Sequence, residues 1–123
     1  MGWTFQADRP IYAQLIDEVK RRIISGVYPP GEKMPPVREL AAEAAVNPNT
    51  MQRAFAQLEQ EGLLYTMRTS GRFVTEDQER ITEMKNELAK KLMDSFLYEM
   101  EQLGYTHQQS VAMLERAERK EEK

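Results

Sequence analysis

The sequence predicts a mainly α-helical fold with one small β-hairpin. Apolar residues recur every three or four positions through most of the chain, one helix ends and another begins near position 47, and the apolar period shortens to two after Gly62. With 123 residues, the chain fits one small domain and a short appendage. We expect the domain in residues 1–76 and a two-helix segment in residues 77–123.

The first helix is expected from Pro10 to about Ser25. Proline is favoured at the first position of a helix, and the apolar positions that follow step by four residues. These positions are Ile11, Leu15, Val19 and Ile23. Gly26 stands where helices often end in a left-handed residue, and the Pro-Pro-Gly run after it forces a turn. Only a short extended piece, residues 32–34, fits before the next helix.

A second short helix is expected from Pro36 to about Ala45, and a third begins directly after it. Asn47 is a favourable N-cap and Pro48 a favourable first residue, so the chain forms a helix, a tight turn and another helix. The third helix ends at Gly62 and places apolar side chains inward and polar ones outward. The inward residues are Met51, Ala54, Phe55 and Leu58, and the outward residues are Asn49, Gln52, Arg53 and Gln60.

After Gly62, the pattern predicts a hairpin with strands 63–67 and 72–75 around a basic turn. Thr75 or Asp77 can cap the long helix that follows, which runs to about Leu103. The apolar residues of this helix are mostly four positions apart, whereas a left-handed coiled coil repeats about every 3.5 residues. This spacing suits a nearly straight helix packed in a bundle. A last helix follows Thr106, which forms a capping-box pattern with the glutamine three residues later.

Three helices followed by a hairpin is the element order of a winged helix-turn-helix domain, in which the helix after the turn enters the major groove of DNA. The alternative is a generic helical domain with an incidental hairpin. The whole chain is acidic, with a net charge of -3 and a pI of about 5.3, so DNA binding needs a local basic patch. Residues 33–72 hold five basic and four acidic side chains, and three of the bases lie on the third helix or the hairpin.

Six segments of the first 76 residues form a specific combination. They are Arg9-Pro10-Ile11-Tyr12, Ser25 to Pro35, Val37-Arg38-Glu39-Leu40-Ala41, Val46-Asn47-Pro48-Asn49-Thr50, Leu58 to Leu63 and Gly71-Arg72-Phe73-Val74. This combination resembles the GntR-type bacterial transcription regulators over roughly residues 9–76. The Asn-Pro-Asn-Thr turn and the short stretch after the hairpin are similar to the small YtrA-type subfamily.

The resemblance implies that Arg38 contacts DNA, that the start of the third helix reads bases and that the hairpin glycine approaches the minor groove. The planar guanidinium of Arg38 suits phosphate or guanine edges, and a surface ion pair with Glu39 or Glu43 is the alternative. Many family members carry arginine where this chain has Pro48 and Gln52, so their base readout does not transfer to these positions. The residues expected to contact DNA are Lys33, Arg38, Asn47, Asn49, Thr50, Gln52, Arg53, Arg68, Ser70, Gly71 and Arg72.

The two helices of residues 77–123 are too short to enclose a core, so we expect them to pair with a second copy. The residues expected at this dimer surface are Ile81, Met84, Leu88, Leu92, Phe96, Met100, Leu103, Val111 and Leu114. A two-fold dimer would place two reading helices about 34–36 Å apart and so predicts an inverted-repeat operator in double-stranded DNA. The alternative is a monomer whose apolar stripe packs back on residues 1–76.

Features that would support catalysis are missing from the sequence. There is no cysteine and a single histidine, His107. The sequence shows no nucleophile paired with a base, and no glycine-rich loop that could bind phosphate. We therefore expect no enzyme activity, no cofactor and no metal site. No apolar run approaches the roughly 18 residues of a membrane span, so we expect no membrane contact and a cytoplasmic location.

The expected function is that of a dimeric DNA-binding transcription regulator, with repression implied by the resemblance. The resemblance also implies an operon that encodes a transporter as the target, and an unidentified small-molecule effector is a further partner. The competing interpretation is a protein-interaction or dimerisation module that uses the winged fold without binding DNA. Salt-insensitive behaviour toward every duplex would distinguish that module from a regulator.

Overall fold

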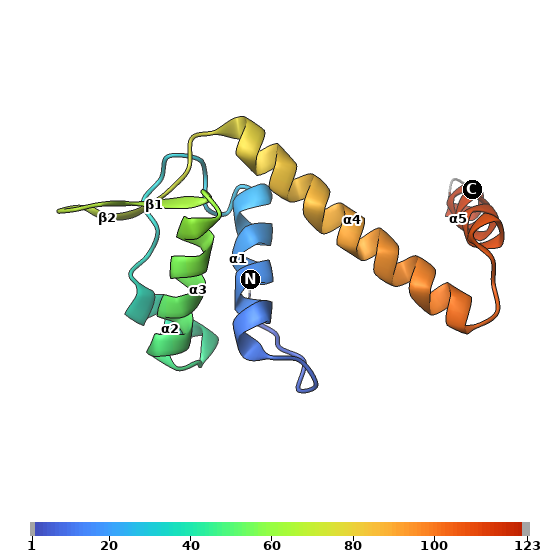
Figure 1. The fold of residues 1–123 in the computed structure, drawn as a ribbon, viewed down its shortest axis with the longest axis horizontal. Helices are drawn as coiled ribbons and strands as arrows, with labels where there is room; N and C mark the ends of the chain where they lie inside the picture. The colour runs from blue at the N-terminus through green and yellow to red at the C-terminus, as the bar shows by residue number, and fades with distance from the viewer. Residues whose placement is uncertain (1, 122–123) are drawn as a thin grey trace. The chain divides into compact units, whose positions relative to one another are not determined.

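The computed structural model describes residues 2–121, with side chains to residue 118. Within this range the chain forms five helices and one two-stranded antiparallel sheet (Figure 1). In chain order the elements are α1 (Ile11–Ile24), α2 (Val37–Ala44), α3 (Pro48–Gln60), β1 (Leu64–Met67), β2 (Gly71–Val74), α4 (Gln78–Gln102) and α5 (His107–Glu121). The predicted fold class, mainly helical with a hairpin after the third helix, is confirmed.

The chain divides into two compact units, Met1–Lys85 and Asn86–Lys123, which we call the head and the tail. The boundary lies inside α4, so the first turns of this helix belong to the head. Met84 accounts for this, because its side chain is fully buried in the core of the head. The expected division at residues 76 and 77 concerns function and stays a prediction.

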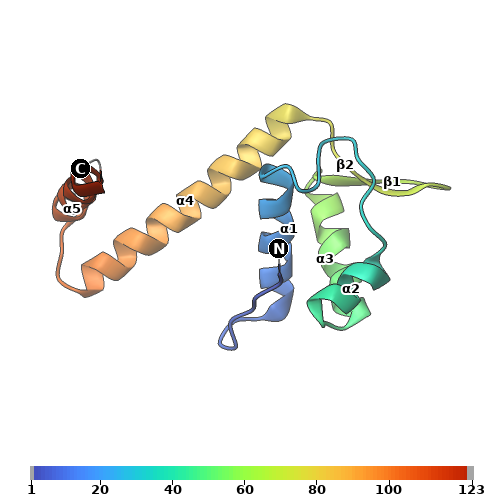
Figure 2. The ribbon, with the colours of Figure 1, turned by 180° about the vertical axis from the view of Figure 1, so that it is seen from behind.

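The core of the head is built by α1, α2, α3 and the hairpin. α1 and α3 lie side by side in both views of the ribbon, and α2 packs on α3 (Figures 1 and 2). The largest side chains that are fully buried are Phe55, Leu15, Leu40, Met51, Leu58, Leu63 and Met84. Burial of each such side chain stabilises the fold by about 1.5–3 kcal/mol relative to exposure. The inward face predicted for α3 is confirmed.

Three of the predicted helix starts are held by their own side chains. The side-chain oxygen of Asn47 accepts the N–H of the second residue of α3 at 2.7 Å. Asp77 caps α4, since its carboxylate accepts two N–H groups of the first turn at 3.1 and 3.2 Å, while Thr75 accepts the N–H of Asp77 itself. Thr106 and Gln109 form the predicted capping box, with reciprocal bonds of 2.8 and 3.1 Å.

The hairpin is widened by the segment that precedes α2. β1 and β2 pair antiparallel, with Leu64 opposite Val74, and residues 31–34 lie along the other edge of β2. Here the N–H of Met34 donates to the carbonyl oxygen of Arg72 at 2.8 Å. The extended piece expected at residues 32–34 therefore forms an isolated bridge, Lys33 with Phe73, that ties the start of α2 to the hairpin.

Candidate nucleic-acid interface

The turn between α2 and α3 is held by backbone and side-chain hydrogen bonds. Ala45 ends α2 in the left-handed region, with φ of 57°, which is uncommon for a residue with a side chain. The N–H of Val46 then donates to the carbonyl oxygen of Ala41 at 3.0 Å. The oxygen of the Asn47 side chain caps α3, and its amide nitrogen offers two donors for the predicted contact with DNA.

The outer face of α3 carries polar side chains that reach solvent. Asn49, Gln52 and Arg53 are exposed and share one face, since residues three and four apart are neighbours on a helix. Thr50 lies at the edge of this face and is half-buried. The guanidinium of Arg53 lies 4.8 Å from the ring centroid of Tyr12 in α1, which orients it. The structure therefore brings together the predicted readers of α3.

Arg38 lies in the first turn of α2 and is exposed. Across the described residues it forms no ion pair with Glu39 or Glu43, so the alternative considered for this arginine is absent from the structure. A guanidinium offers five donors in a planar fork, which matches the oxygen atoms of a phosphate or a guanine edge. Arg38 therefore has the exposure and the chemistry that its predicted role requires.

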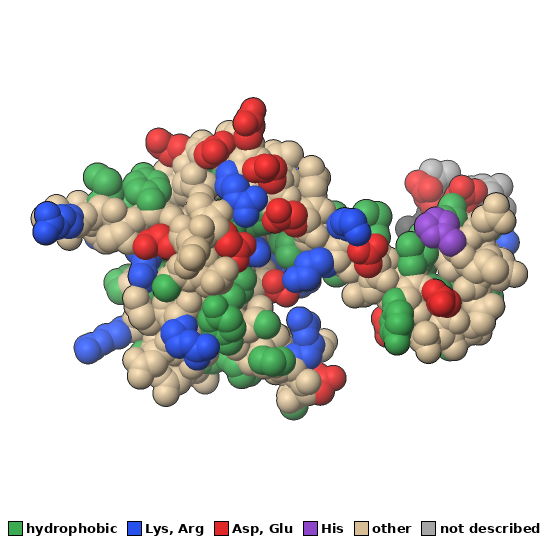
Figure 3. All heavy atoms as spheres, viewed as in Figure 1, with side chains coloured by type: hydrophobic (Ala, Val, Ile, Leu, Met, Phe, Trp, Pro, Cys, Tyr) green, Lys and Arg blue, Asp and Glu red, His purple; other side chains and the backbone are tan. Residues whose placement is uncertain are grey.

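The tip of the hairpin is polar and basic. Arg68 and Ser70 are exposed in the turn, whose backbone closes through the N–H of Ser70 and the carbonyl oxygen of Met67 at 3.0 Å. A basic side chain stands at this tip in Figure 3, whereas acidic side chains gather over the upper part of the head. Gly71 follows with φ of 107°, and a Cβ there would lie 3.1 Å from Cε of Lys33. The absence of a side chain at Gly71 therefore leaves room for the Lys33 side chain beside the first residue of β2.

A hollow of about 310 Å³ is lined by residues of the segment before α2, the start of α2, α3 and the hairpin. It is lined by Lys33, Met34, Pro35, Pro36, Val37, Phe55, Gly71 and Arg72. Three of the predicted DNA contacts, from two separate segments of the chain, thus surround one depression with an apolar floor.

Arg72 is held within the head, and its expected contact with DNA stays a prediction. Its Nε lies 3.1 Å from a carboxylate oxygen of Glu59, and Nη1 lies 3.2 Å from the side-chain oxygen of Gln52. The guanidinium carbon lies 5.6 Å from the ring centroid of Phe55, and only 19% of the side chain is exposed. Two predicted DNA contacts, Arg72 and Gln52, are therefore bonded to each other.

Glu59 receives a second bond from the hairpin. The hydroxyl of Thr66 donates to the same carboxylate, and the strand register places Thr66 directly opposite Arg72. The bond from Thr66 and the ion pair with Arg72 outweigh burial and hold the pKa of the Glu59 carboxyl below its ordinary value. Glu59 thus anchors both strands of the hairpin to α3 in its charged form.

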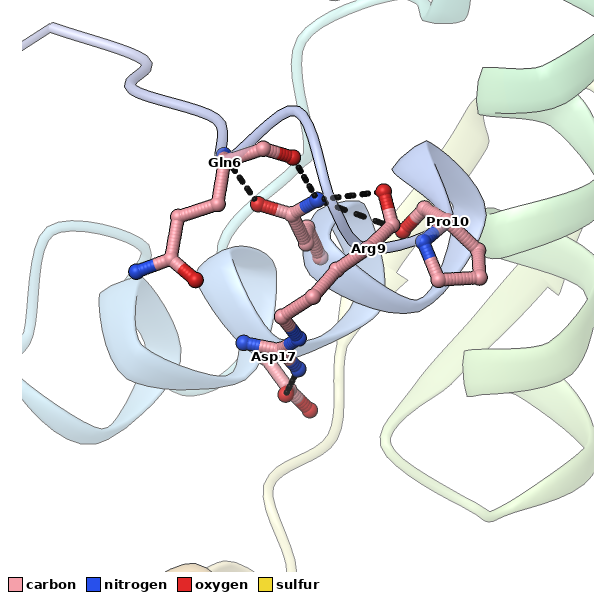
Figure 4. A network of polar contacts seen from close by, with 5 residues as sticks. Gln6, Arg9, Pro10 and Asp17 are labelled. Carbon is pink, nitrogen blue, oxygen red and sulfur yellow. Dashed lines mark hydrogen bonds and ion pairs between the residues drawn. The ribbon is translucent and has the colours of Figure 1, made fainter.

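Residues 2–9, for which the sequence predicted no structure, fold against α1. The buried side chain of Gln14 accepts the N–H of Gln6 at 2.7 Å and donates to the carbonyl oxygens of Gln6 and Arg9 at 2.9 Å (Figure 4). Residues 2–9 show no periodic spacing of apolar residues that would predict their structure. The available signal was a pair of aromatic residues, Trp3 and Phe5, which pack against the core.

Arg22 of α1 is a second buried polar residue that the sequence did not reveal. Its guanidinium lies 3.9 Å from the ring centroid of Trp3, bonds Glu18 at 3.0 Å and donates to the hydroxyl of Tyr28 at 3.2 Å. Burial opposes the charge, but the bonds to Glu18 and Tyr28 outweigh it and raise the pKa of Arg22. These contacts stiffen α1, on which α3 rests.

The tail exposes apolar side chains. Every residue of the core cluster lies between Leu15 and Met84, so none belongs to the tail. The large apolar side chains that the tail exposes are Leu92, Met93, Tyr98, Leu103, Tyr105, Val111 and Leu114. Of the residues expected at a dimer surface, Met84 is fully buried in the head and Ile81 packs against its core. This corrects the expectation for Met84, whose side chain serves the fold of one chain, while the expectation for the half-buried Ile81 stays a prediction.

The described residues hold neither a membrane-spanning helix nor a metal-binding group of side chains. No helix in residues 2–121 is long and apolar enough to cross a membrane. Among the side chains that the structure describes, which end at residue 118, no group of three or more histidines, aspartates and glutamates could hold a metal ion. The exposed polar face of α3, the exposed Arg38 and the basic tip of the hairpin form the candidate site.

Comparison with known sequences agrees with this geometry. The family described as "Bacterial regulatory proteins, gntR family" matches residues 11–74. The chain is 37% identical over 105 residues to the HTH-type transcriptional regulator YhcF of Bacillus subtilis, a match that spans 85% of this chain and 87% of the relative. It is 34% identical over 96 residues to the HTH-type transcriptional repressor YtrA of the same organism, with 73% and 74% covered.

Solved structures show the same similarity. A GntR family transcriptional regulator from Listeria monocytogenes superposes with a TM-score of 0.82 at 39% identity, over 91% of this chain and 98% of that one. The structure of AraR(DBD) in complex with operator ORX1 matches 61% of this chain and 99% of its own, with a TM-score of 0.55 and 30% identity. That neighbour was captured with operator DNA.

Proposed function

The chain belongs to the GntR family of bacterial regulatory proteins, and we propose that it is a dimeric repressor that binds an inverted-repeat operator. The family and the relatives matched are DNA-binding transcription regulators and not enzymes. The observation that carries the proposal is the exposed polar face of α3, positioned by a capped turn beside the exposed Arg38 and a basic hairpin tip.

The candidate residues divide into two kinds of contact. Lys33, Arg38, Arg53 and Arg68 are exposed cations that would bind phosphates and supply much of the affinity. The amide and hydroxyl groups at the start of α3 both donate and accept hydrogen bonds, so they suit the edges of bases in the major groove. Asn49, Thr50 and Gln52 would therefore supply much of the selectivity.

The tail supports pairing of two chains. A segment with seven exposed large apolar side chains and none of the core residues lacks the burial that stabilises a folded unit. A second copy would cover these side chains, with Leu88, Leu92, Phe96, Met100, Leu103, Val111 and Leu114 at the surface. Two-fold symmetry would then set the reading helices about 34–36 Å apart, which matches one turn of DNA.

Repression is supported by the likeness to YtrA, which is named as a transcriptional repressor. The small YtrA-type resemblance carries the further proposal of a transporter operon as target. An unidentified small-molecule effector and a cytoplasmic location are proposed as well. Selection from fragmented genomic DNA would test the target, because the recovered fragments would name the neighbouring genes.

Selection of bound fragments from random double-stranded DNA, followed by sequencing, tests the central proposal. The expected result is a two-fold-related sequence whose affinity falls steeply with salt, bound by a protein that light scattering identifies as a dimer. Flat, salt-insensitive behaviour toward all duplexes would contradict DNA binding and favour an interaction module. A monomer at tens of micromolar would contradict the dimer.

A further inference from the structure

Arg72 lies where three elements of the head meet. It belongs to β2, its ion pair reaches Glu59 of α3 at 3.1 Å, and Glu59 also binds Thr66 of β1. The second branch of its guanidinium reaches Gln52, which is exposed on the polar face of α3. One half-buried arginine thus connects the hairpin with the residue best placed to meet a base.

The direction of the Gln52 amide follows from the chemistry of its partner. A guanidinium has five N–H donors and no acceptor, so Arg72 can bond only the oxygen of the amide. The bond from Nη1 to this oxygen, at 3.2 Å, therefore turns the NH₂ group of Gln52 to the opposite end. A glutamine without such a partner can present either end, because the amide is free to rotate.

We propose that Arg72, anchored by Glu59, is a positioning residue that holds Gln52 with its NH₂ group toward DNA. Gln52 then reads a base edge rich in acceptors, such as O6 and N7 of guanine. The inference rests on the proposed function, in which α3 enters the major groove. It assigns to Arg72 an indirect part in base selection in place of a phosphate contact.

The surroundings of Arg72 favour this role over binding of phosphate. Its charge is neutralised by Glu59, its side chain is only 19% exposed, and the ring of Phe55 lies against the guanidinium. Arg68, four residues earlier in the same hairpin, is exposed and has the freedom that a phosphate contact needs. The two arginines of the hairpin therefore have different roles: Arg72 positions Gln52, and Arg68 binds phosphate.

The test compares the DNA preference of the intact protein with that of four variants. Gln52→Ala first identifies the base pair that Gln52 reads, as the position at which preference is lost. Arg72→Met keeps a long apolar stem against Phe55 but removes every donor, and Glu59→Ala removes the anchor. Arg68→Met is the matched control, because it removes one charge from the exposed tip of the same hairpin.

We expect Arg72→Met and Glu59→Ala to lose preference at the base pair read by Gln52 by roughly tenfold or more, as the loss of an oriented contact predicts. Arg68→Met should keep that preference and weaken binding to all duplexes alike. A phosphate-binding Arg72 would behave otherwise: Arg72→Met would reduce the salt slope by about 1, Glu59→Ala would strengthen binding, and base preference would stay unchanged. That result would overturn the inference.

Arg72→Lys provides a second test that does not depend on the tolerance of the head for methionine. It keeps the positive charge, but one ammonium group cannot replace the fork that joins Glu59 to Gln52. We expect the same loss of preference with an unchanged salt slope, and retention of preference would count against the inference. If the wild-type protein selects no sequence, the proposed function fails and this inference with it. If the wild-type protein selects a sequence and every variant keeps the wild-type base preference, the proposed function stands and only this inference fails.

Discussion

The head and the tail use their apolar residues in opposite ways. In the head, residues from α1, α2, α3, the hairpin and the start of α4 converge on one core, and Phe55 and Leu15 are completely buried. In the tail, Leu92 is 59% exposed and Leu103 73% exposed, and no residue between Met84 and residue 118, where the described side chains end, belongs to the core. The apolar stripe of α4 is continuous in sequence, yet it serves a core at one end and a surface at the other.

This difference indicates a division of labour. A head that encloses its own core can hold α2, α3 and the hairpin in fixed positions without help, as a reading surface requires. A tail with exposed apolar side chains gains stability only when another surface covers them. Folding of the head should therefore be independent of protein concentration, and order in the tail should depend on pairing.

The largest difference between the head and the tail is expected when the same substitution is made in each unit. Phe55→Ala should lower the free energy of unfolding of the head by about 3–5 kcal/mol, because it leaves a cavity among fully buried neighbours. Phe96→Ala in the tail should leave head stability unchanged. Denaturant unfolding followed by Trp3 fluorescence measures this, since the only tryptophan packs on Arg22 in the head. Equal losses in the two variants would mean that the units are not independent.

The next prediction concerns the exposed stripe of the tail. Leu92→Asp and Leu103→Asp should convert the proposed dimer into a monomer, because a buried charge without a partner costs several kcal/mol. The head should keep its unfolding midpoint. Light scattering checks the mass, and Val27→Asp is the control, since Val27 is 44% exposed in the head. A dimer that persists in both tail variants would place the contact elsewhere.

Local chemistry explains what the sequence predicted correctly. The cap of Asn47 on α3 acts across two residues, and the box of Thr106 and Gln109 across three, so both are visible in a short window. Helical period likewise separates the buried Met51 from the exposed Gln52 on α3. These features were enough to predict α3 and the face that it exposes.

Contacts between distant residues explain what it did not predict. Glu59 and Arg72 are 13 positions apart and meet only because the hairpin folds back over α3, which no periodicity encodes. The burial of Arg22 depends in the same way on Trp3, from a segment without helical spacing. Met84 belongs to the same stripe as Leu92, and only the packing of the head decides where the stripe leaves the core.

A third prediction sharpens the role of the head as the reading unit. Arg38→Ala should weaken binding to the selected operator roughly tenfold and reduce the salt slope by about 1, with no change in the unfolding midpoint. Arg21→Ala is the control, because Arg21 is an exposed arginine of α1 outside the candidate site. Fluorescence anisotropy at several salt concentrations measures both quantities. Unchanged affinity of Arg38→Ala at physiological salt would remove Arg38 from the interface.

The smallest predicted effect is a pH dependence confined to the head. Glu61 pairs with Lys20 of α1 at 2.9 Å and accepts a bond from Gln57 at 2.9 Å. Burial alone would raise the pKa of Glu61, but these two contacts outweigh it and place the pKa below the ordinary value of 4.5. A carboxyl with a lowered pKa in the folded state contributes stability above its unfolded pKa, and that contribution is lost as the pH falls through the folded value.

Glu61→Gln should therefore lose less stability than the wild type between about pH 6 and about pH 3, while costing no more than about 1 kcal/mol at neutral pH. Lys20→Met should flatten the same part of the profile, because it removes the partner that lowers the pKa of Glu61. Thermal unfolding of the three proteins across this pH range, followed by Trp3 fluorescence, measures the head alone. Parallel profiles for all three proteins would show that the ion pair between Lys20 and Glu61 adds nothing to the stability of the head.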